Sequence, residues 1–114
     1  MPPSIVVLSQ EDPRKTHRPV EALRIALGLS TGGNPLSVVL LGPSRLLTTD
    51  DLDDVVDVDV LEKYLPSFAQ LDIPMIVPIG SRIEFPPSRQ LKVTEAPVEE
   101  IQRLITQSDR SIIF

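Results

Sequence analysis

Short aliphatic runs alternate with amphipathic stretches along this chain, and this alternation restricts the possible folds more than any other feature. The run LSVVLL at 36–41 shows no alternation of apolar and polar residues, which is typical of a strand covered on both faces. Similar runs at 4–8 and 73–79, and shorter ones at 91–93 and 111–114, indicate four further strands.

Three stretches between these runs have helical spacing. Pro19 fits the first turn of one helix, which the sequence GGNP at 32–35 then ends. Asp59 is followed three residues later by a glutamate, a pattern typical of a helix start, and Pro66 within this second helix predicts a kink or two short helices. Pro97 opens the third helix.

This order of elements predicts one α/β domain over residues 1–114. Strands that alternate with helices favour a mostly parallel sheet, here of about five strands, with helices on both faces. The expected fold is therefore a flavodoxin-like three-layer sandwich. A chain of 114 residues is long enough to bury one hydrophobic core.

Composition excludes several classes of function. The chain contains no cysteine, which rules out disulfides, thiolate metal ligands and thiol catalysis by its own residues. The net charge of −5 argues against a nucleic-acid partner. No apolar run is long enough to span a bilayer, and the opening MPPSIVV lacks the features of a signal peptide, so we expect a cytoplasmic protein without membrane contact.

A basic loop follows the first predicted strand. Because this loop leads into a helix, whose amino-terminal N–H groups favour anions, it is a candidate anion or ligand site. The alternative is an ordinary solvated loop. The candidate residues are Arg14, Lys15, His17 and Arg18.

A glycine turn after the third predicted strand gives the second candidate site, at Gly80, Ser81 and Arg82. It lies at the carboxyl end of an inner strand, where open α/β sheets bind ligands. A serine nucleophile at Ser81 would need a base, and His17 is the only histidine in the sequence. The sequence GSRIE also lacks the G-x-S-x-G pattern of hydrolases, which argues against hydrolase activity.

The acidic run at 50–59, DDLDDVVDVD, raises the question of a metal site. Calcium loops need a glycine at the tight turn and a terminal glutamate at fixed spacing, and this run has neither. Acidic residues before a helix stabilise its positive end instead. We therefore expect neither a metal nor a cofactor.

Two segments resemble the DsrE/DsrF-like family of small sulfur-relay proteins, which includes TusB, TusC and TusD. One is the opening SIVVLSQEDPRKTHRPVEALRIALGLSTGGNPLSVVLLG, with a strand, a loop, an Ala/Leu-rich helix and a strand that ends in glycine. The other is VEEIQRLITQSDRSIIF, which is similar to the closing helix, the Asp-Arg pair (here Asp109 and Arg110) and the last strand of the family. The resemblance covers nearly the whole chain.

The resemblance implies a subunit without sulfurtransferase chemistry. Catalytic members carry a cysteine at the end of the third strand, and this cysteine accepts sulfur as a persulfide. The corresponding position falls at or beside Pro78, and proline cannot accept sulfur. Members without the cysteine serve as structural partners, so we expect a homo-oligomer that assembles with, docks or regulates a sulfur-carrier protein. The alternative is a module that binds a small molecule, an anion or a nucleotide at the two candidate sites.

Overall fold

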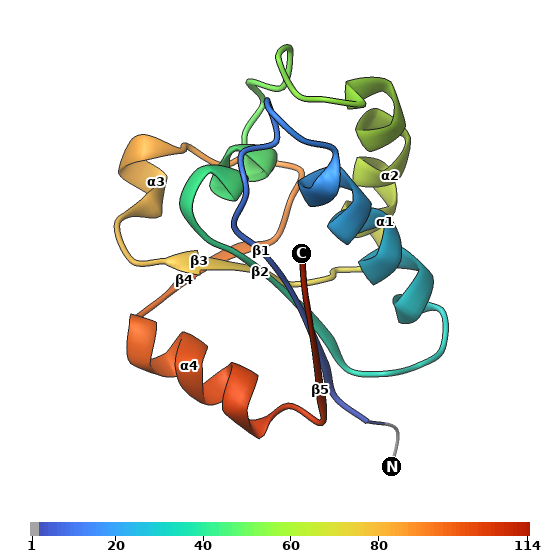
Figure 1. Ribbon diagram of the computed structural model, residues 1–114, viewed down its shortest axis with the longest axis vertical. Coiled ribbons are helices and arrows are strands. Elements are labelled where there is room, and N and C mark those ends of the chain that lie inside the picture. The colour runs from blue at the N-terminus through green and yellow to red at the C-terminus, as the bar shows by residue number, and fades with distance from the viewer. Residues whose placement is uncertain (1–2) are drawn as a thin grey trace.

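The computed structural model describes residues 3–114. At its centre is a five-stranded parallel sheet with helices packed on it (Figure 1). The strand order is β4-β3-β2-β1-β5, and each neighbouring pair is parallel. The strands are β1 (Ile5–Ser9), β2 (Leu36–Leu40), β3 (Met75–Pro78), β4 (Val93–Ala96) and β5 (Arg110–Ile113).

Helices cover both faces of this sheet. Helices α1 (Arg18–Ser30) and α2 (Val58–Gln70) lie on one face, and α4 (Val98–Gln107) lies on the other (Figure 1). The change of face follows from the strand order, because the connection from β4 to β5 runs back across the sheet and a right-handed crossover then places its helix on the opposite side. This is the flavodoxin-like three-layer arrangement expected from the sequence.

Alternate residues of the central strands enter two separate hydrophobic cores. Val7 and Val38 face α1 and α2, whereas Val6 and Val39 face α4. Successive side chains of a strand point to opposite faces, so a strand covered on both sides needs apolar residues at every position. The largest residues of the first core are Leu23, Leu40, Leu47, Leu61, Phe68 and Met75.

The proline in α2 does not divide the helix into the two short helices that were one of the two expectations. A single helix runs from Val58 to Gln70 through the exposed Pro66. Leu61 and Phe68, on either side of the proline, are both buried in the first core. Their packing holds the two halves in one helix despite the backbone hydrogen bond that proline removes.

Three local elements differ from the sequence-based expectation. Strand β4 begins at Val93 rather than ending there, because its pairing with β3 aligns Met75 with Val93 and Pro78 with Ala96. The sequence analysis also missed two short helices, the 3₁₀-helix η1 (Gly42–Thr48) and α3 (Ser81–Glu84). In the part of the chain that the structure describes, no helix has the length and apolar character to cross a membrane.

Candidate functional site

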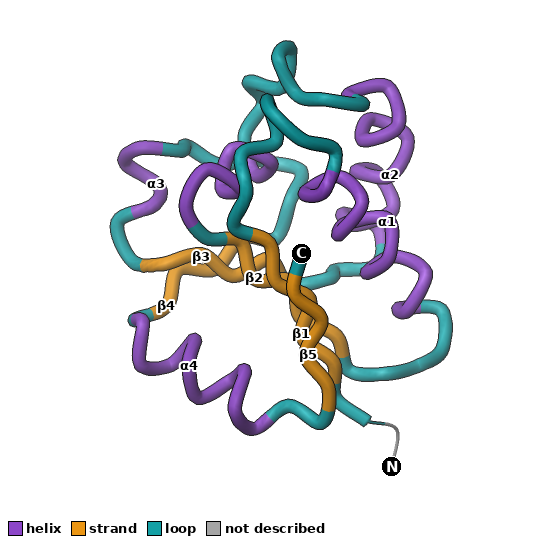
Figure 2. The backbone as a smooth tube through the Cα atoms, viewed as in Figure 1, coloured by secondary structure: helices purple, strands orange, loops and turns teal. Residues whose placement is uncertain are grey.

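Three connecting segments meet at the carboxyl edge of the sheet, the usual location of ligand sites in this class of fold. They are the loop after β1, the helix η1 after β2, and the turn that leads from β3 into α3 (Figure 2). The residues of these segments determine what chemistry the edge can support.

The loop after β1 is joined to η1 by buried hydroxyl groups. The Oγ atoms of Ser9 and Ser44 lie 2.8 Å apart, and both residues are fully buried. Ser44 Oγ donates its proton to the carbonyl oxygen of Glu11 at 2.6 Å, so Ser9 is the donor between the two hydroxyls. Because Ser44 donates its only hydroxyl proton to the Glu11 carbonyl oxygen, we interpret this pair as a structural contact between β1 and η1.

Ser81 is also buried, at 2% exposure. Its Oγ donates to the carbonyl oxygen of Pro78 at 2.6 Å and accepts a hydrogen bond from Arg45 Nη1 at 3.2 Å. Gly80 before it has a φ of 92°, a left-handed conformation that suits glycine. The hydroxyl is therefore bound on both sides and directed back toward its own strand.

Arg45 is the central residue of this edge, and the sequence analysis missed it. Its Nε donates to the carbonyl oxygen of Gly42 at 2.8 Å, and its Nη2 lies 3.2 Å from Glu84 Oε2. Its guanidinium lies 4.6 Å from the centre of the Phe85 ring, within cation–π range. The signal was its position directly after the second strand, in the sequence GPSR.

Arg82 turns away from the basic loop toward β4. Glu95 Oε2 accepts the backbone N–H groups of Gly80 at 2.9 Å and Arg82 at 3.1 Å. The Arg82 side chain donates to the carbonyl oxygen of Val93 at 2.6 Å and lies 3.8 Å from the Glu95 carboxylate. The charge of this arginine is thus largely compensated at the edge strand.

The basic loop is paired with its own carboxylates. Arg14 donates to both carboxylate oxygens of Asp12 at 3.0 Å, and Arg18 lies 3.9 Å from Glu11. The Arg14 hydrogen bond holds the pKa of Asp12 below its usual value of 3.8.

Within residues 3–114, the other two candidate residues of the loop, Lys15 and His17, join no salt bridge. His17 stands at the amino-terminal cap of α1 without a side-chain capping bond. Lys15 is exposed.

The two predicted sites are not joined. Strand β2 lies between β1 and β3, and in residues 3–114 no hydrogen bond or salt bridge connects the loop at 14–18 to the turn at 80–82. His17 is therefore not paired with Ser81, and the serine nucleophile considered above has no base hydrogen-bonded to it.

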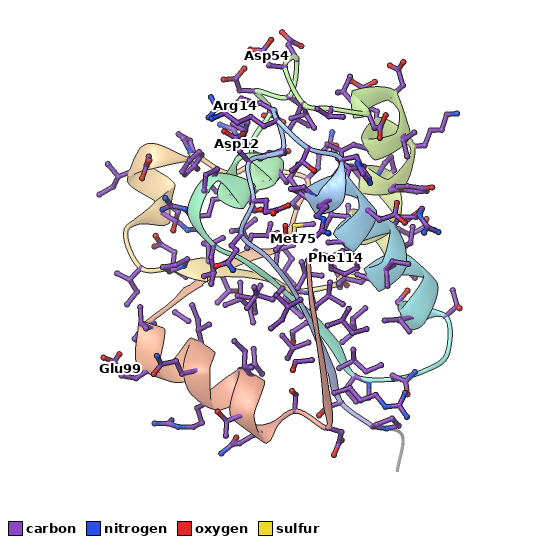
Figure 3. The ribbon with its side chains drawn as sticks, viewed as in Figure 1. Asp12, Arg14, Asp54, Met75, Glu99 and Phe114 are labelled. Atoms are coloured by element: carbon purple, nitrogen blue, oxygen red, sulfur yellow. The ribbon has the colours of Figure 1, made fainter. Side chains whose placement is uncertain are left out.

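An open pocket of about 500 Å³ lies beside these contacts. Its apolar lining residues are Leu46, Phe85, Pro86 and Pro87. The carboxylates of Asp50, Asp51 and Glu84 also line it, together with Thr49 and Arg14. Figure 3 shows Arg14, Asp12 and Asp54 at this same end of the molecule.

The acidic run contributes to helix formation and to this surface. Asp57 adopts a left-handed φ of 62° as the residue before α2, and its carbonyl oxygen accepts the N–H groups of Val60 and Leu61. Across the described residues, no group of three or more histidine, aspartate or glutamate side chains is placed to hold a metal ion.

Comparison with known proteins gives a likeness of fold. No protein-family model matches the chain, and no curated protein matches it. Among solved structures, the crystal structure of the YchN protein from E. coli is similar, with a TM-score of 0.79 and 14% sequence identity, and the alignment covers 100% of both chains. At this identity the match shows the fold alone, an α/β fold shared over the whole length of both chains.

Proposed function

We propose that this protein is a non-catalytic subunit of a DsrE/DsrF-like sulfur-relay system, which assembles with or docks a protein that carries sulfur. The fold likeness to YchN over the whole chain and the sequence resemblance both support this proposal. The absence of cysteine excludes a persulfide on this chain.

The turn after β3 carries the proposal, because its polar atoms are engaged while its apolar side chains are exposed. By the resemblance, the position of the family cysteine falls at or beside Pro78. The Ser81 hydroxyl is held by the Pro78 carbonyl oxygen and by Arg45. Ile79 in this turn is 66% exposed, and Ile83 in the adjoining helix α3 is 90% exposed. Single exposed apolar residues are common, but we take two within five residues as a contact surface.

Self-association is the second part of the proposal. Helix α4 alone covers its face of the sheet, and an apolar pocket of about 240 Å³ beside it is lined mainly by Ile76, Ala96, Ile101 and Leu104. A second copy would bury this surface. We propose that the protein forms a homo-oligomer and acts in the cytoplasm.

Native mass spectrometry tests both parts. The purified protein is measured alone and after mixing with a persulfidated sulfur-carrier protein. We expect a discrete oligomer that captures the carrier without gaining the mass of a sulfur atom. A protein that ignores the carrier, or one that retains a small anion instead, would contradict the proposed role.

A further inference from the structure

The pocket beside Arg45 has the size of a ligand site. Its volume of about 500 Å³ falls within the range of pockets that hold small molecules. Its apolar lining combines the half-buried Phe85 ring with Leu46 and two prolines, Pro86 and Pro87. Such a lining favours the methylene groups or the planar head of a long side chain over a compact ion.

The charges of the lining residues indicate whether the pocket favours a cation or an anion. Arg14 is neutralised by Asp12, and Glu84 is neutralised by Arg45. Asp50 and Asp51 remain, both exposed and neither in a salt bridge within residues 3–114. The uncompensated charge of the pocket is therefore negative, although the sequence places a basic cluster beside it.

The molecule already binds one guanidinium with the residues of this pocket. Arg45 lies 4.6 Å from the centre of the Phe85 ring and 3.2 Å from the Glu84 carboxylate. Both Phe85 and Glu84 also line the pocket. An arginine from outside could contact the same apolar wall and place its charge against Asp50 and Asp51.

We propose that this pocket receives an arginine side chain from a basic segment of a partner protein. The acidic run beyond the pocket, with Asp53 and Asp54 exposed on the same loop, would attract such a segment from solution. This inference extends the proposed docking role to a second contact and names the chemistry of the partner. It does not depend on whether that partner carries sulfur.

Fluorescence anisotropy with a short labelled peptide of glycine, serine and arginine tests the proposal. We expect saturable binding to the full chain that weakens with added salt. A peptide with citrulline in place of arginine keeps the shape without the charge, and we expect it not to bind. Chemical shift changes on titration should centre on Phe85 and Leu46.

Matched variants distinguish binding by the carboxylates of the pocket from nonspecific attraction by the negative charge of the whole acidic run. The pair Asp50→Asn and Asp51→Asn removes two charges from the pocket, and the pair Asp53→Asn and Asp54→Asn removes the same two charges from the adjacent loop. We expect the first pair to weaken arginine binding by about tenfold or more, since charged hydrogen bonds are lost. The second pair should weaken it by less than about twofold, because Asp53 and Asp54 do not line the pocket and would act on the arginine only through solvent-screened charge.

Equal weakening by both pairs, or equal binding of the citrulline peptide, would overturn the pocket assignment. Carrier capture without peptide binding would reject this inference and leave the proposed docking role intact. Peptide binding without carrier capture would support this inference and contradict the proposed docking of a sulfur carrier.

Discussion

Arg45 and Ser81 are joined by a hydrogen bond of 3.2 Å between Nη1 and Oγ, across a sequence separation of 36 residues. This bond ties the segment after β2 to the turn after β3. The same guanidinium reaches the Gly42 carbonyl oxygen, the Glu84 carboxylate and the Phe85 ring. One side chain therefore fixes the geometry of the carboxyl edge.

Replacing Arg45 with alanine should destabilise the fold by about 2 kcal/mol, because several charge-assisted contacts of a mostly buried group are lost together. Arg45→Lys should recover less than half of this, since an ammonium cannot reproduce the planar fork. Urea denaturation measures both changes. Arg24→Ala is the control, since within residues 3–114 the Arg24 side chain makes only an exposed pair with Glu21, and it should cost less than about 0.5 kcal/mol. Equal losses for the two alanine variants would contradict the role of Arg45.

Ser44→Ala should cost more than Ser9→Ala, although the two hydroxyls form one pair. Loss of Ser44 leaves the buried Ser9 hydroxyl without an acceptor, at a cost of about 1 to 3 kcal/mol. Loss of Ser9 leaves Ser44 still bonded to the Glu11 carbonyl oxygen. A double-mutant cycle in urea should show that Ser9→Ala is neutral or stabilising once Ser44 is absent. Additive costs would show that the two hydroxyls do not interact.

Ile83→Asp should abolish carrier capture without loss of stability, because Ile83 is 90% exposed. Leu71→Asp is the matched control, as Leu71 is 54% exposed just after α2, away from the turn after β3. Pull-down of the carrier and thermal denaturation measure the two effects separately. If both variants capture the carrier as the wild type does, the contact surface lies elsewhere.

Acid should weaken the fold through Asp12. Arg14 lowers the pKa of Asp12 below 3.8 in the folded state, so ionised Asp12 stabilises the fold above that pH. This contribution is lost as the pH falls through the lower folded pKa. Arg14→Gln should therefore reduce stability at pH 6 more than at pH 3, and an NMR titration should show the pKa of Asp12 rising toward 3.8.

Lys15→Gln provides the control for the acid prediction, because it removes an equal charge from the neighbouring position. The Lys15 side chain acts on the Asp12 carboxylate only through its charge, whereas Arg14 also donates hydrogen bonds to that carboxylate. The Lys15 variant should therefore shift the titration much less. Equal shifts in the two variants would assign the effect to net charge rather than to the hydrogen bond.

The sequence predicted the layers of this fold better than it predicted the site. The aliphatic runs identified β1, β2 and β3, because strands buried on both faces need apolar residues throughout. The two short helices after β2 and β3 lack a periodic signal of their own. Helix η1 was missed for this reason, and Arg45 was missed with it.

The spacing of charged residues along the sequence also did not show which of them are paired with an opposite charge in the fold. Arg14 and Arg18 form a basic cluster in the sequence, but in the fold each lies beside an acidic residue of its own loop. Arg82 is paired with Glu95, which is distant in sequence and becomes its neighbour only through the pairing of β3 with β4. Ion pairing of this kind depends on tertiary structure, which a single sequence does not display.

The position of β5 beside β1 has a consequence for synthesis of the chain. Backbone and side-chain groups of Ser4 bond to Asp109, a separation of 105 residues, and β1 pairs with β5 over four positions. Because β5 is translated long after β1, one side of the apolar strand IVVLS has no neighbour until almost all of the described fold has emerged from the ribosome. An unpaired apolar edge is prone to pairing with other chains. The nascent protein would be most vulnerable to aggregation along β1, and a chaperone that shields this strand would aid its production.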